Sequence, residues 1–269
     1  VPAEKSLHVR VVGAGPAGLS AALAASLRGH RVEVLEAAHE PGGQLRAASR
    51  PPGKGGLARW VEWAVRMLER DGVRVRTGVT VTAETLAEGE PEFVVLATGS
   101  LPLKPPIPGI DGPNVVEARE MLLAGAAARD RAVVLGAGYV GMESADFLAS
   151  KGAKVTVLEM LTRPPVGRHE THGYWLHRRL RDSGGTLVTG AEVVRIEPGA
   201  VIYLEGGEER RVEPAPTVVL ALGARPDTSL VSALEDARIP HSLAGDAVVP
   251  GRLLEAVHGG HAAGLALPG

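Results

Sequence analysis

The sequence contains no cysteine among its 269 residues. This absence excludes disulfide bonds, thiolate nucleophiles and iron–sulfur clusters held by thiolates of this chain. Aromatic residues make up only 3% of the sequence, which argues against a platform on which nucleic-acid bases stack. The formal net charge is −2, so the composition does not indicate nucleic acid or an anionic membrane surface as a partner.

Long apolar runs are also missing from the sequence. No stretch reaches the roughly 18 consecutive apolar residues that a membrane-spanning helix needs. The chain begins at Val1, and its first residues do not show a basic segment followed by an apolar core, the pattern of a secretory signal. We therefore expect a cytoplasmic protein without a membrane partner. The missing initial methionine is compatible with a preceding segment that has been removed or left out.

Glycine, by contrast, is abundant with 35 residues, and the most informative glycines form the turn Gly-Ala-Gly-Pro-Ala-Gly at 13–18. The apolar run at 9–12 predicts a buried strand before this turn, and a helix is expected from Pro16 onward. Residues 31–35 predict a second strand, which ends at Glu36. Strand, glycine turn, helix, strand and acid form the pattern of a dinucleotide-binding unit.

The residue types in this pattern fit the chemistry of a dinucleotide. Glycines allow the backbone to turn sharply and to approach a diphosphate without an intervening side chain. The start of the helix offers free N–H groups and the positive end of a dipole to the phosphates. A carboxylate at the end of the second strand can accept hydrogen bonds from the hydroxyl groups of a ribose.

The same pattern occurs a second time. An apolar strand at 133–135 leads into the turn Gly-Ala-Gly-Tyr-Val-Gly at 136–141, and a strand at 155–158 ends at Glu159. The first glycine and the acid are 23 positions apart in both copies. Two unrelated glycine turns are the alternative, but they would not repeat the spacing to the acid. We therefore predict two bound nucleotides, one for each unit.

The remaining segments predict an α/β fold in which the second unit is inserted into the first. A helix is expected at 57–71 and strands at 73–76 and 79–81, and a buried strand at 93–97 ends in Thr-Gly-Ser. The proline-rich stretch 101–113 is the best candidate for a linker. Residues 217–223 repeat the pattern of 93–99. We place one domain at 1–108 and 226–269, and the other at 109–225.

Two clusters of polar residues have competing interpretations. Lys54, together with Arg46 and Arg50, lies in a loop that either contacts phosphate or is simply solvated. The histidines at 169, 172 and 177 could offer nitrogen ligands to a metal, but they have no clear acidic partners in the sequence. We therefore favour surface or helix-end histidines and predict no metal site and no catalytic residue.

These motifs resemble the flavoproteins that contain two dinucleotide-binding domains of the Rossmann-like, glutathione-reductase type. The resemblance rests on the glycine turn at 13–18, Glu36, Gly-Gly-Gln-Leu at 42–45, Ala-Thr-Gly at 97–99 and Gly-Asp at 245–246. It covers nearly the whole chain. It implies that the first domain binds FAD and that the second, inserted domain binds NAD(P)H.

Within these flavoproteins the chain is most similar to the C-terminal half of the trimethylamine dehydrogenase and 2,4-dienoyl-CoA reductase group. The stretches that suggest this group are 107–116, 174–180 and 245–264. In that group a barrel carrying FMN and an iron–sulfur cluster precede the two domains, and both are absent from this sequence. The resemblance implies a subunit or fragment whose redox partner carries FMN, an iron–sulfur cluster or both.

The resemblance also implies roles for individual residues at the FAD site. Around the diphosphate it places Gly13, Gly15, Pro16, Ala17, Ala97, Thr98 and Gly99. Toward the flavin and its ribityl chain it places Gly43, Gln44, Leu45, Gly245, Asp246 and Ala256, where a helix N-terminus would favour negative charge on the ring. Glu36 would bind the adenosine ribose, and the backbone of Val81 would meet the adenine. A helix N-cap is the alternative role for Asp246.

At the second site the resemblance implies that Gly136, Gly138 and Gly141 hold the diphosphate of the nicotinamide cofactor. Glu159 would bind the 2′-hydroxyl group of its ribose. Since a carboxylate repels a 2′-phosphate, we expect NADH rather than NADPH. Arg163 and Arg168 follow closely in the sequence and would reverse this preference if they bound the phosphate.

The function implied is an FAD-dependent oxidoreductase module that passes electrons between NAD(H) and a redox centre outside the chain. Hydride transfer needs alignment and exclusion of water more than an acid or a base. Two alternatives remain open. One is a structural subunit that binds ADP in place of FAD and has no redox chemistry. The other is a free-standing ferredoxin or flavodoxin reductase without cysteines.

Overall fold

The computed structural model describes residues 2–125 and 130–269, and the chain divides into two compact units. The first unit contains Val1–Arg46, Gly56–Leu101 and Ala224–Gly269, and the second contains Ala47–Gly55 and Pro102–Gly223. Each unit is built around a five-stranded sheet whose strands are joined mainly through helices. The predicted α/β fold with two Rossmann-like units is confirmed.

The sheet of the first unit is parallel and has the strand order β15-β4-β1-β2-β3. Its strands are β1 (His8–Val12), β2 (Arg31–Glu36), β3 (Arg74–Thr77), β4 (Phe93–Leu96) and β15 (His241–Leu243). The central strands β1 and β4 are almost entirely buried, as expected where a parallel sheet is covered on both faces. Their carboxyl ends meet at one edge of the sheet, next to the first glycine turn.

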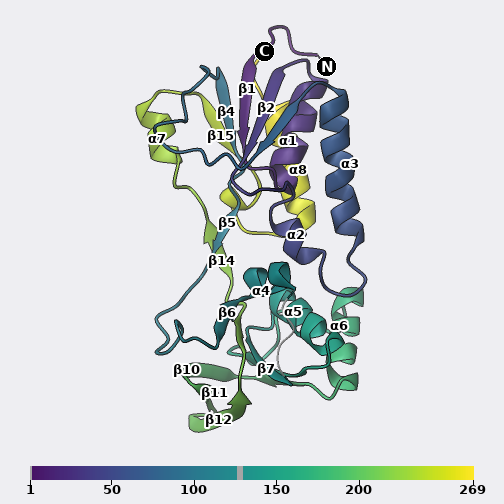
Figure 1. The fold of residues 1–269 in the computed structure, drawn as a ribbon, viewed down its shortest axis with the longest axis vertical. Coiled ribbons are helices and arrows are strands. Elements are labelled where there is room, and N and C mark those ends of the chain that lie inside the picture. The colour runs from purple at the N-terminus through teal and green to yellow at the C-terminus, as the bar shows by residue number, and fades with distance from the viewer. Residues whose placement is uncertain (1, 126–129) are drawn as a thin grey trace. The chain divides into compact units, whose positions relative to one another are not determined.

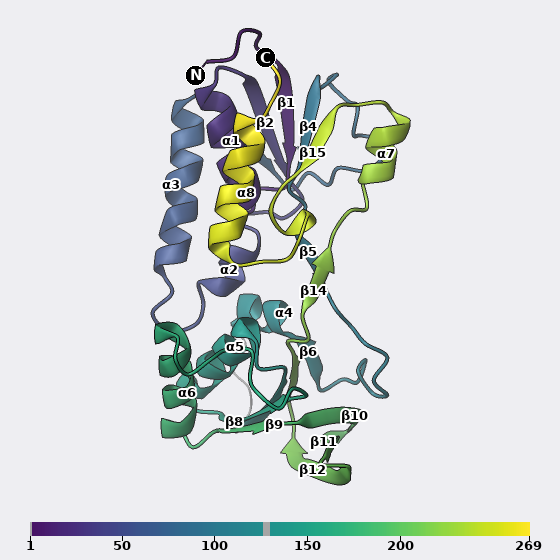
Figure 2. The same ribbon diagram turned by 180° about the vertical axis from the view of Figure 1, so that it is seen from behind.

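Three helices lie side by side on one face of this sheet (Figure 1). They are α1 (Pro16–Leu27), α3 (Gly56–Arg70) and α8 (Leu253–Leu265). Figure 2 shows the same layer from behind, with α8 running along α1. The shorter elements are α2 (Gln44–Ala48), β5 (Ser100–Pro102), β14 (Ala224–Pro226), α7 (Val231–Asp236) and the 3₁₀ turn η1 (Gly245–Ala247).

The predicted strand at 79–81 is wrong. Gly78 has a φ of +70°, and its N–H group donates a hydrogen bond to the carbonyl oxygen of Ala38 over 2.8 Å. The next N–H group, that of Val79, donates to the carbonyl oxygen of Glu36 over 2.8 Å. These two bonds turn the chain around the end of β2, so the alternating residues that follow do not run beside a neighbouring strand.

The second unit repeats this architecture with the strand order β6-β13-β7-β8-β9. These strands are also parallel: β6 (Val115–Glu117), β7 (Arg131–Leu135), β8 (Lys154–Glu159), β9 (Thr186–Thr189) and β13 (Val218–Leu220). Helix α5 (Tyr139–Ser150) contacts both α4 (Ala118–Ala124) and α6 (Thr171–Asp182). The apolar side chains of α5 and the sheet form one continuous core.

The second unit also contains an antiparallel sheet of three strands. It consists of β10 (Ala191–Glu197), β11 (Gly199–Glu205) and β12 (Glu208–Ala215). Ion pairs join side chains on the exposed face of this sheet. One of them is bidentate, with Arg195 donating hydrogen bonds of 2.9 and 2.8 Å to the Glu209 carboxylate. Apolar residues on the opposite face, such as Val201, pack against the parallel sheet.

Within residues 2–125 and 130–269, the structure contains no helix of the length and apolar character needed to traverse a bilayer.

A buried histidine makes the stability of the first unit depend on pH. The His30 side chain is 6% exposed, and its Nδ1 atom accepts a hydrogen bond from the N–H group of Leu7 over 3.2 Å. Burial, together with the nearby Arg28 guanidinium, lowers the pKa of His30 below its ordinary value of 6.5. The unfolded chain therefore takes up this proton at a higher pH than the folded chain does.

We expect the contribution of neutral His30 to the free energy of unfolding to be fully present above a pH of about 6.5. It should be lost as the pH falls toward the pKa of His30 in the folded state. Because an asparagine oxygen can replace Nδ1 as acceptor and does not titrate, His30→Asn should make the free energy of unfolding fall less steeply on acidification. Urea denaturation at a series of pH values measures this slope. A slope identical to that of the wild-type protein would contradict the assignment.

Candidate dinucleotide-binding sites

The first glycine turn uses its glycines in two different ways. A Cβ atom on Gly13, where φ is +104°, would lie 2.9 Å from the carbonyl carbon of Ala97 and nearer still to its oxygen. A Cβ atom on Gly18 would meet the Gly13 carbonyl group at 3.0 Å or less. At Gly15, the nearest described atom would be the Cα atom of Gly43 at 4.0 Å. Gly13 and Gly18 are therefore required for packing, whereas a Cβ atom at Gly15 would make only an ordinary van der Waals contact.

The second turn repeats these contacts almost atom for atom. A Cβ atom on Gly136 would lie 3.1 Å from the carbonyl carbon of Ala221, and one on Gly141 would lie 3.0 Å from that of Gly136. Around Gly138, apart from Gly138 itself and its two chain neighbours, no atom of residues 2–125 or 130–269 lies within 4 Å of the added Cβ. Each unit thus has one glycine in the turn that its own packing does not explain, and a closely approaching diphosphate would explain it.

The two predicted acids have the same surroundings in the two units. Glu36 is 8% exposed, and its carboxylate accepts hydrogen bonds from the N–H groups of Ala14 at 2.7 Å and Ala38 at 2.8 Å. Glu159 is 5% exposed and accepts hydrogen bonds from Ala137 at 2.7 Å and Leu161 at 2.9 Å. Because a carboxylate has about four acceptor positions, each acid fixes its turn and retains capacity for ribose hydroxyl groups.

The start of each helix supplies donors for phosphate oxygens. The backbone ladders begin with the N–H group of Leu19 bonding to Gly15 and that of Met142 bonding to Gly138, both at 2.9 Å. In an α-helix the N–H groups that precede the first such bond have no partner within the helix. The N–H group of Ala17 belongs to this set. Pro16 lacks an N–H group, so its contribution is the fixed φ angle at the first helical position.

A polar cluster joins three distant segments of the first unit. The Oδ2 atom of Asp246 accepts hydrogen bonds from Gln44 Nε2 and Ser100 Oγ, each at 3.0 Å. Its Oδ1 atom accepts a hydrogen bond from the N–H group of Gly251 at 3.0 Å. The alternative interpretation of Asp246 as the N-cap of the following helix is wrong, because Arg252 occupies the N-cap position of α8. Ser100 was not predicted, although it directly follows the Ala-Thr-Gly turn.

Other predicted residues of the first site pack closely against the first glycine turn. The Gly43 backbone approaches Gly15, since an added Cβ would lie 3.0 Å from the Gly15 Cα. Gly245 has a φ of +63° and fits between Ala17 and Ala256, so an added Cβ would lie 2.5 Å from the Ala17 Cβ. Leu45 is buried. These contacts hold the Gly42–Leu45 loop and the start of η1 against the glycine turn.

Two predicted residues have side chains that are engaged elsewhere. The hydroxyl group of Thr98 donates to the carbonyl oxygen of Asp227 at 2.6 Å, and the N–H group of Asp227 donates to Gly99 at 3.0 Å. This exchange joins the end of β4 to the segment that follows β14. Val81 packs against an apolar cluster that includes Val12 and Leu86. The Thr98 hydroxyl group and the Val81 side chain thus already have partners within the first unit.

A charged cluster beside the second glycine turn was not predicted. Lys54 forms an ion pair with Glu143 on α5, so the solvated interpretation of this lysine is wrong. His172 Nε2 lies 3.0 Å from Glu143 Oε1, and its ring stacks on that of Tyr139 with centroids 5.7 Å apart. His177 is buried and contacts the carbonyl oxygen of Val166 at 2.8 Å. The surface interpretation of His177 is therefore wrong as well.

Two parallel α/β units, each with a glycine turn and an acid at the end of its second strand, define the class of oxidoreductases with two dinucleotide-binding domains. The sequence profile of the pyridine nucleotide-disulphide oxidoreductases matches residues 7–253. The chain belongs to this family, which binds FAD and NAD(P)H, and it is an oxidoreductase module of that family.

Individual relatives agree with this assignment. The chain is 40% identical over 258 residues to an NADH oxidase of Thermoanaerobacter brockii, which covers 94% of this chain and 40% of the relative. It is 40% identical over 164 residues to the epsilon subunit of an NADH-dependent phenylglyoxylate dehydrogenase of Aromatoleum evansii, covering 54% of this chain and 37% of that one. The chain spans about two fifths of the length of such curated relatives.

A solved structure of 2-naphthoyl-CoA reductase superimposes on the whole chain with a TM-score of 0.92 and 27% sequence identity, over 41% of that protein. The resemblance to two-domain flavoproteins of this group, which the sequence motifs predict, is confirmed.

Proposed function

We propose that this chain uses FAD to pass electrons between NADH and a redox centre outside the chain, namely FMN or an iron–sulfur cluster on a partner. The observation that carries this proposal is the pair of glycines, Gly15 and Gly138, at which an added Cβ atom would meet no obstacle although the turns are otherwise tightly packed. Each lies in the same unit as a buried carboxylate bound to the turn. Two equivalent sites support two dinucleotides with different roles.

The residues of the first unit fit FAD. The glycine turn and the α1 N-terminus would face the diphosphate, and Glu36 would bind the adenosine ribose. The cluster of Gln44, Ser100 and Asp246 would present fixed polar groups toward the ribityl chain. Bound FAD would supply the hydride and electron chemistry. The task of the protein residues is to bind and orient the two cofactors, and general acid–base chemistry is not required of them.

The composition of the chain and the length of its relatives support the proposed partner. Since the sequence has no cysteine, this chain cannot provide a disulfide relay or the thiolate ligands of a cluster. The relatives are more than twice as long as the match, and one similar chain is a named subunit of a larger enzyme. Both observations favour an electron acceptor or donor located on another domain or chain.

Anaerobic titration of the FAD-loaded protein with NADH tests the proposal. We expect the flavin absorbance at about 450 nm to decrease in proportion to the NADH added. An unchanged spectrum of a flavin-loaded sample would overturn the proposal. Release of ADP alone from the native protein, identified by mass spectrometry, would instead support a structural nucleotide-binding subunit. Purification without any redox partner but with ferredoxin-reducing activity would support a free-standing reductase.

Glu159→Gln tests whether this carboxylate selects NADH. The amide group would keep one oxygen acceptor but would lose the negative charge and one of the two acceptors that now serve Ala137 and Leu161. Since a hydrogen bond to a charged group contributes about 1.5–3 kcal/mol, we expect NADH affinity to fall by about 10-fold to 100-fold. The ratio of NADH affinity to NADPH affinity should decrease, because the variant repels the 2′-phosphate of NADPH less strongly.

Glu36→Gln is the matched control, because Glu36 has the same partners in the first unit. This substitution should weaken the retention of FAD by the first unit. The dissociation constant of NADH at the unchanged second unit should stay within about twofold of the wild-type value. Fluorescence titration with NADH and NADPH measures both variants. Equal losses of NADH affinity in the two variants would show that the acids do not act at separate sites.

A further inference from the structure

The outer face of α6 contains a basic pocket that lies apart from both glycine turns in the sequence. Arg168, Arg178 and Arg181 line this pocket together with Tyr174, and Leu187 of β9 contributes apolar surface. The pocket has a volume of about 210 Å³. Among the described residues that line it, none is acidic. The pocket therefore favours a negatively charged group.

The acidic side chain nearest along the helix offers only weak competition for these arginines. Asp182 lies 3.4 Å from Arg178 and 3.6 Å from Arg181, and all three side chains are exposed to solvent. Exposed ion pairs of this kind contribute little to stability because solvent and salt screen the two charges. Within the described chain, no acidic side chain lies within ion-pair distance of Arg168. An incoming carboxylate could thus replace Asp182 or bind beside it.

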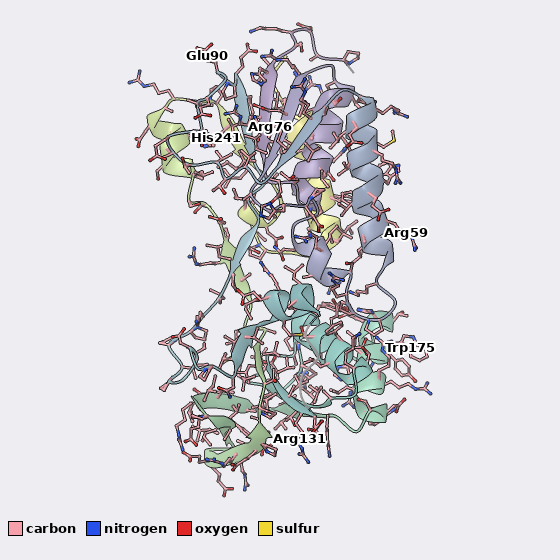
Figure 3. All side chains as sticks on the ribbon, in the orientation of Figure 1. Arg59, Arg76, Glu90, Arg131, Trp175 and His241 are labelled. Carbon is pink, nitrogen blue, oxygen red and sulfur yellow. The ribbon has the colours of Figure 1, made fainter. Side chains whose placement is uncertain are left out.

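Of two neighbouring aromatic side chains on α6, Tyr174 lines the pocket and Trp175 contacts Tyr174 and Arg178. Tyr174 is 47% exposed and Trp175 is 45% exposed, and their rings meet edge to face with centroids 5.4 Å apart. The guanidinium group of Arg178 lies 5.3 Å from the centre of the Trp175 ring. Figure 3 shows Trp175 projecting outward from α6. Tyrosine, tryptophan and arginine together are the residues that dominate binding energy at protein interfaces.

The packing of α6 within its unit does not account for this outer face. On the inner face of the helix, Leu176 and Leu180 pack in the core. Arg179 donates hydrogen bonds of 2.7 and 2.8 Å to the buried Asp146 carboxylate. Residues at 174, 178 and 181 follow the spacing of the opposite helical face. These side chains are therefore available to a partner without disturbing the core.

The size of the pocket limits its occupant. Pockets for cofactors and drug-sized ligands have volumes of about 300–1,000 Å³, so this one is too small for a dinucleotide. It suits one or two side chains, and the planar fork of an arginine matches a carboxylate. We propose that the outer face of α6 is a docking site for an acidic segment of a partner protein, in which a glutamate or aspartate enters the pocket and an apolar residue covers Trp175.

Binding of a short fluorescent peptide, in which glutamates alternate with leucines, tests this proposal by fluorescence anisotropy at low salt. We expect the peptide to bind the wild-type chain, and its glutamine counterpart to bind at least about tenfold more weakly. Arg181→Glu should weaken binding of the acidic peptide by about tenfold or more. Trp175→Ala should weaken the binding of both peptides because it removes the apolar part of the site.

Arg131→Glu is the control, since Arg131 is an exposed arginine at the start of β7 and the variant has the same net charge as Arg181→Glu (Figure 3). It should change the affinity by less than about twofold. Equal losses in the two variants, equal affinity for the glutamine peptide, or equally tight binding of an oligothymidylate would overturn the proposal. A concentration-dependent dimer that Trp175→Ala abolishes would also overturn it in favour of a second copy. The assay uses neither flavin nor NADH, so its outcome is independent of the proposed redox function.

Discussion

Gly15→Ala is expected to produce a folded protein that no longer retains FAD. The added methyl group would lie 4.0 Å from the nearest described atom, the Cα of Gly43. The backbone of Gly15, with φ −74° and ψ −178°, is accessible to alanine. The fold therefore accommodates this methyl group, but it occupies the space through which a diphosphate would approach the start of α1. We expect FAD affinity to fall by about 100-fold, which corresponds to about 2.7 kcal/mol.

Gly18→Ala provides the contrast within the same turn. Its methyl group would lie 3.0 Å from the Gly13 carbonyl carbon and closer still to the oxygen, and such overpacking typically costs about 1–3 kcal/mol. The thermal midpoint of the FAD-free protein should thus fall in Gly18→Ala and stay near that of wild type in Gly15→Ala. Comparison of FAD-free proteins is essential because bound FAD itself raises the midpoint.

The second unit offers an independent repetition of this experiment. Gly138→Ala should weaken NADH binding and leave FAD content unchanged, whereas Gly141→Ala should destabilise the second unit because its methyl group would meet the Gly136 carbonyl group. FAD content by absorbance and NADH affinity by fluorescence titration separate the two sites. Full retention of FAD in Gly15→Ala would show that the diphosphate does not approach this glycine.

The repeated glycine turns could be predicted because their determinants are local. The glycines, the helix that follows and the acid at the end of the second strand lie within one continuous stretch in each unit. The equal spacing from Gly13 to Glu36 and from Gly136 to Glu159 corresponds to nearly identical hydrogen bonds of the two carboxylates. Alternation alone was less reliable, since residues 79–81 alternate but turn around the end of β2.

Contacts between distant segments could not be predicted in the same way. The cluster of Gln44, Ser100 and Asp246 requires the starts of α2, β5 and η1 to meet, and no single spacing in the sequence specifies this meeting. The pairing of Lys54 with Glu143 is similar. The hairpin of β11 and β12 did have a local signal, the Gly-Gly pair at 206–207, whose positive φ angles form the turn.

The second large effect is expected where α8 packs against α1. A Cβ atom on Gly260 would lie 2.7 Å from the carbonyl carbon of Ala17 and 2.8 Å from its Cα atom, and one on Gly264 would lie 2.7 Å from the Cβ atom of Ala24. These obstacles are helix backbone and buried methyl groups that cannot rotate away. Gly260→Ala must therefore push the two helices apart, and we expect it to lower the free energy of unfolding by about 3 kcal/mol.

Gly259→Ala is the matched control in the same turn of α8. Its methyl group would lie 3.5 Å from the nearest described atom, the backbone nitrogen of Gly245, which is ordinary van der Waals contact. Because alanine favours a helix over glycine by about 0.5–1 kcal/mol, this variant should be as stable as wild type or slightly more stable. Urea denaturation of the FAD-free proteins measures the difference between two neighbouring substitutions of the same kind.

Separation of α8 from α1 should also affect the first nucleotide site. Gly245 is wedged between Ala17 and Ala256, so a shift of α8 moves Gly245 and the adjoining Asp246 relative to the start of α1. Gly260→Ala should therefore lose FAD at a temperature at which the wild-type protein retains it, whereas Gly259→Ala should retain FAD as wild type does. Equal stability and equal FAD retention in the two variants would show that the helices have room for a methyl group at Gly260.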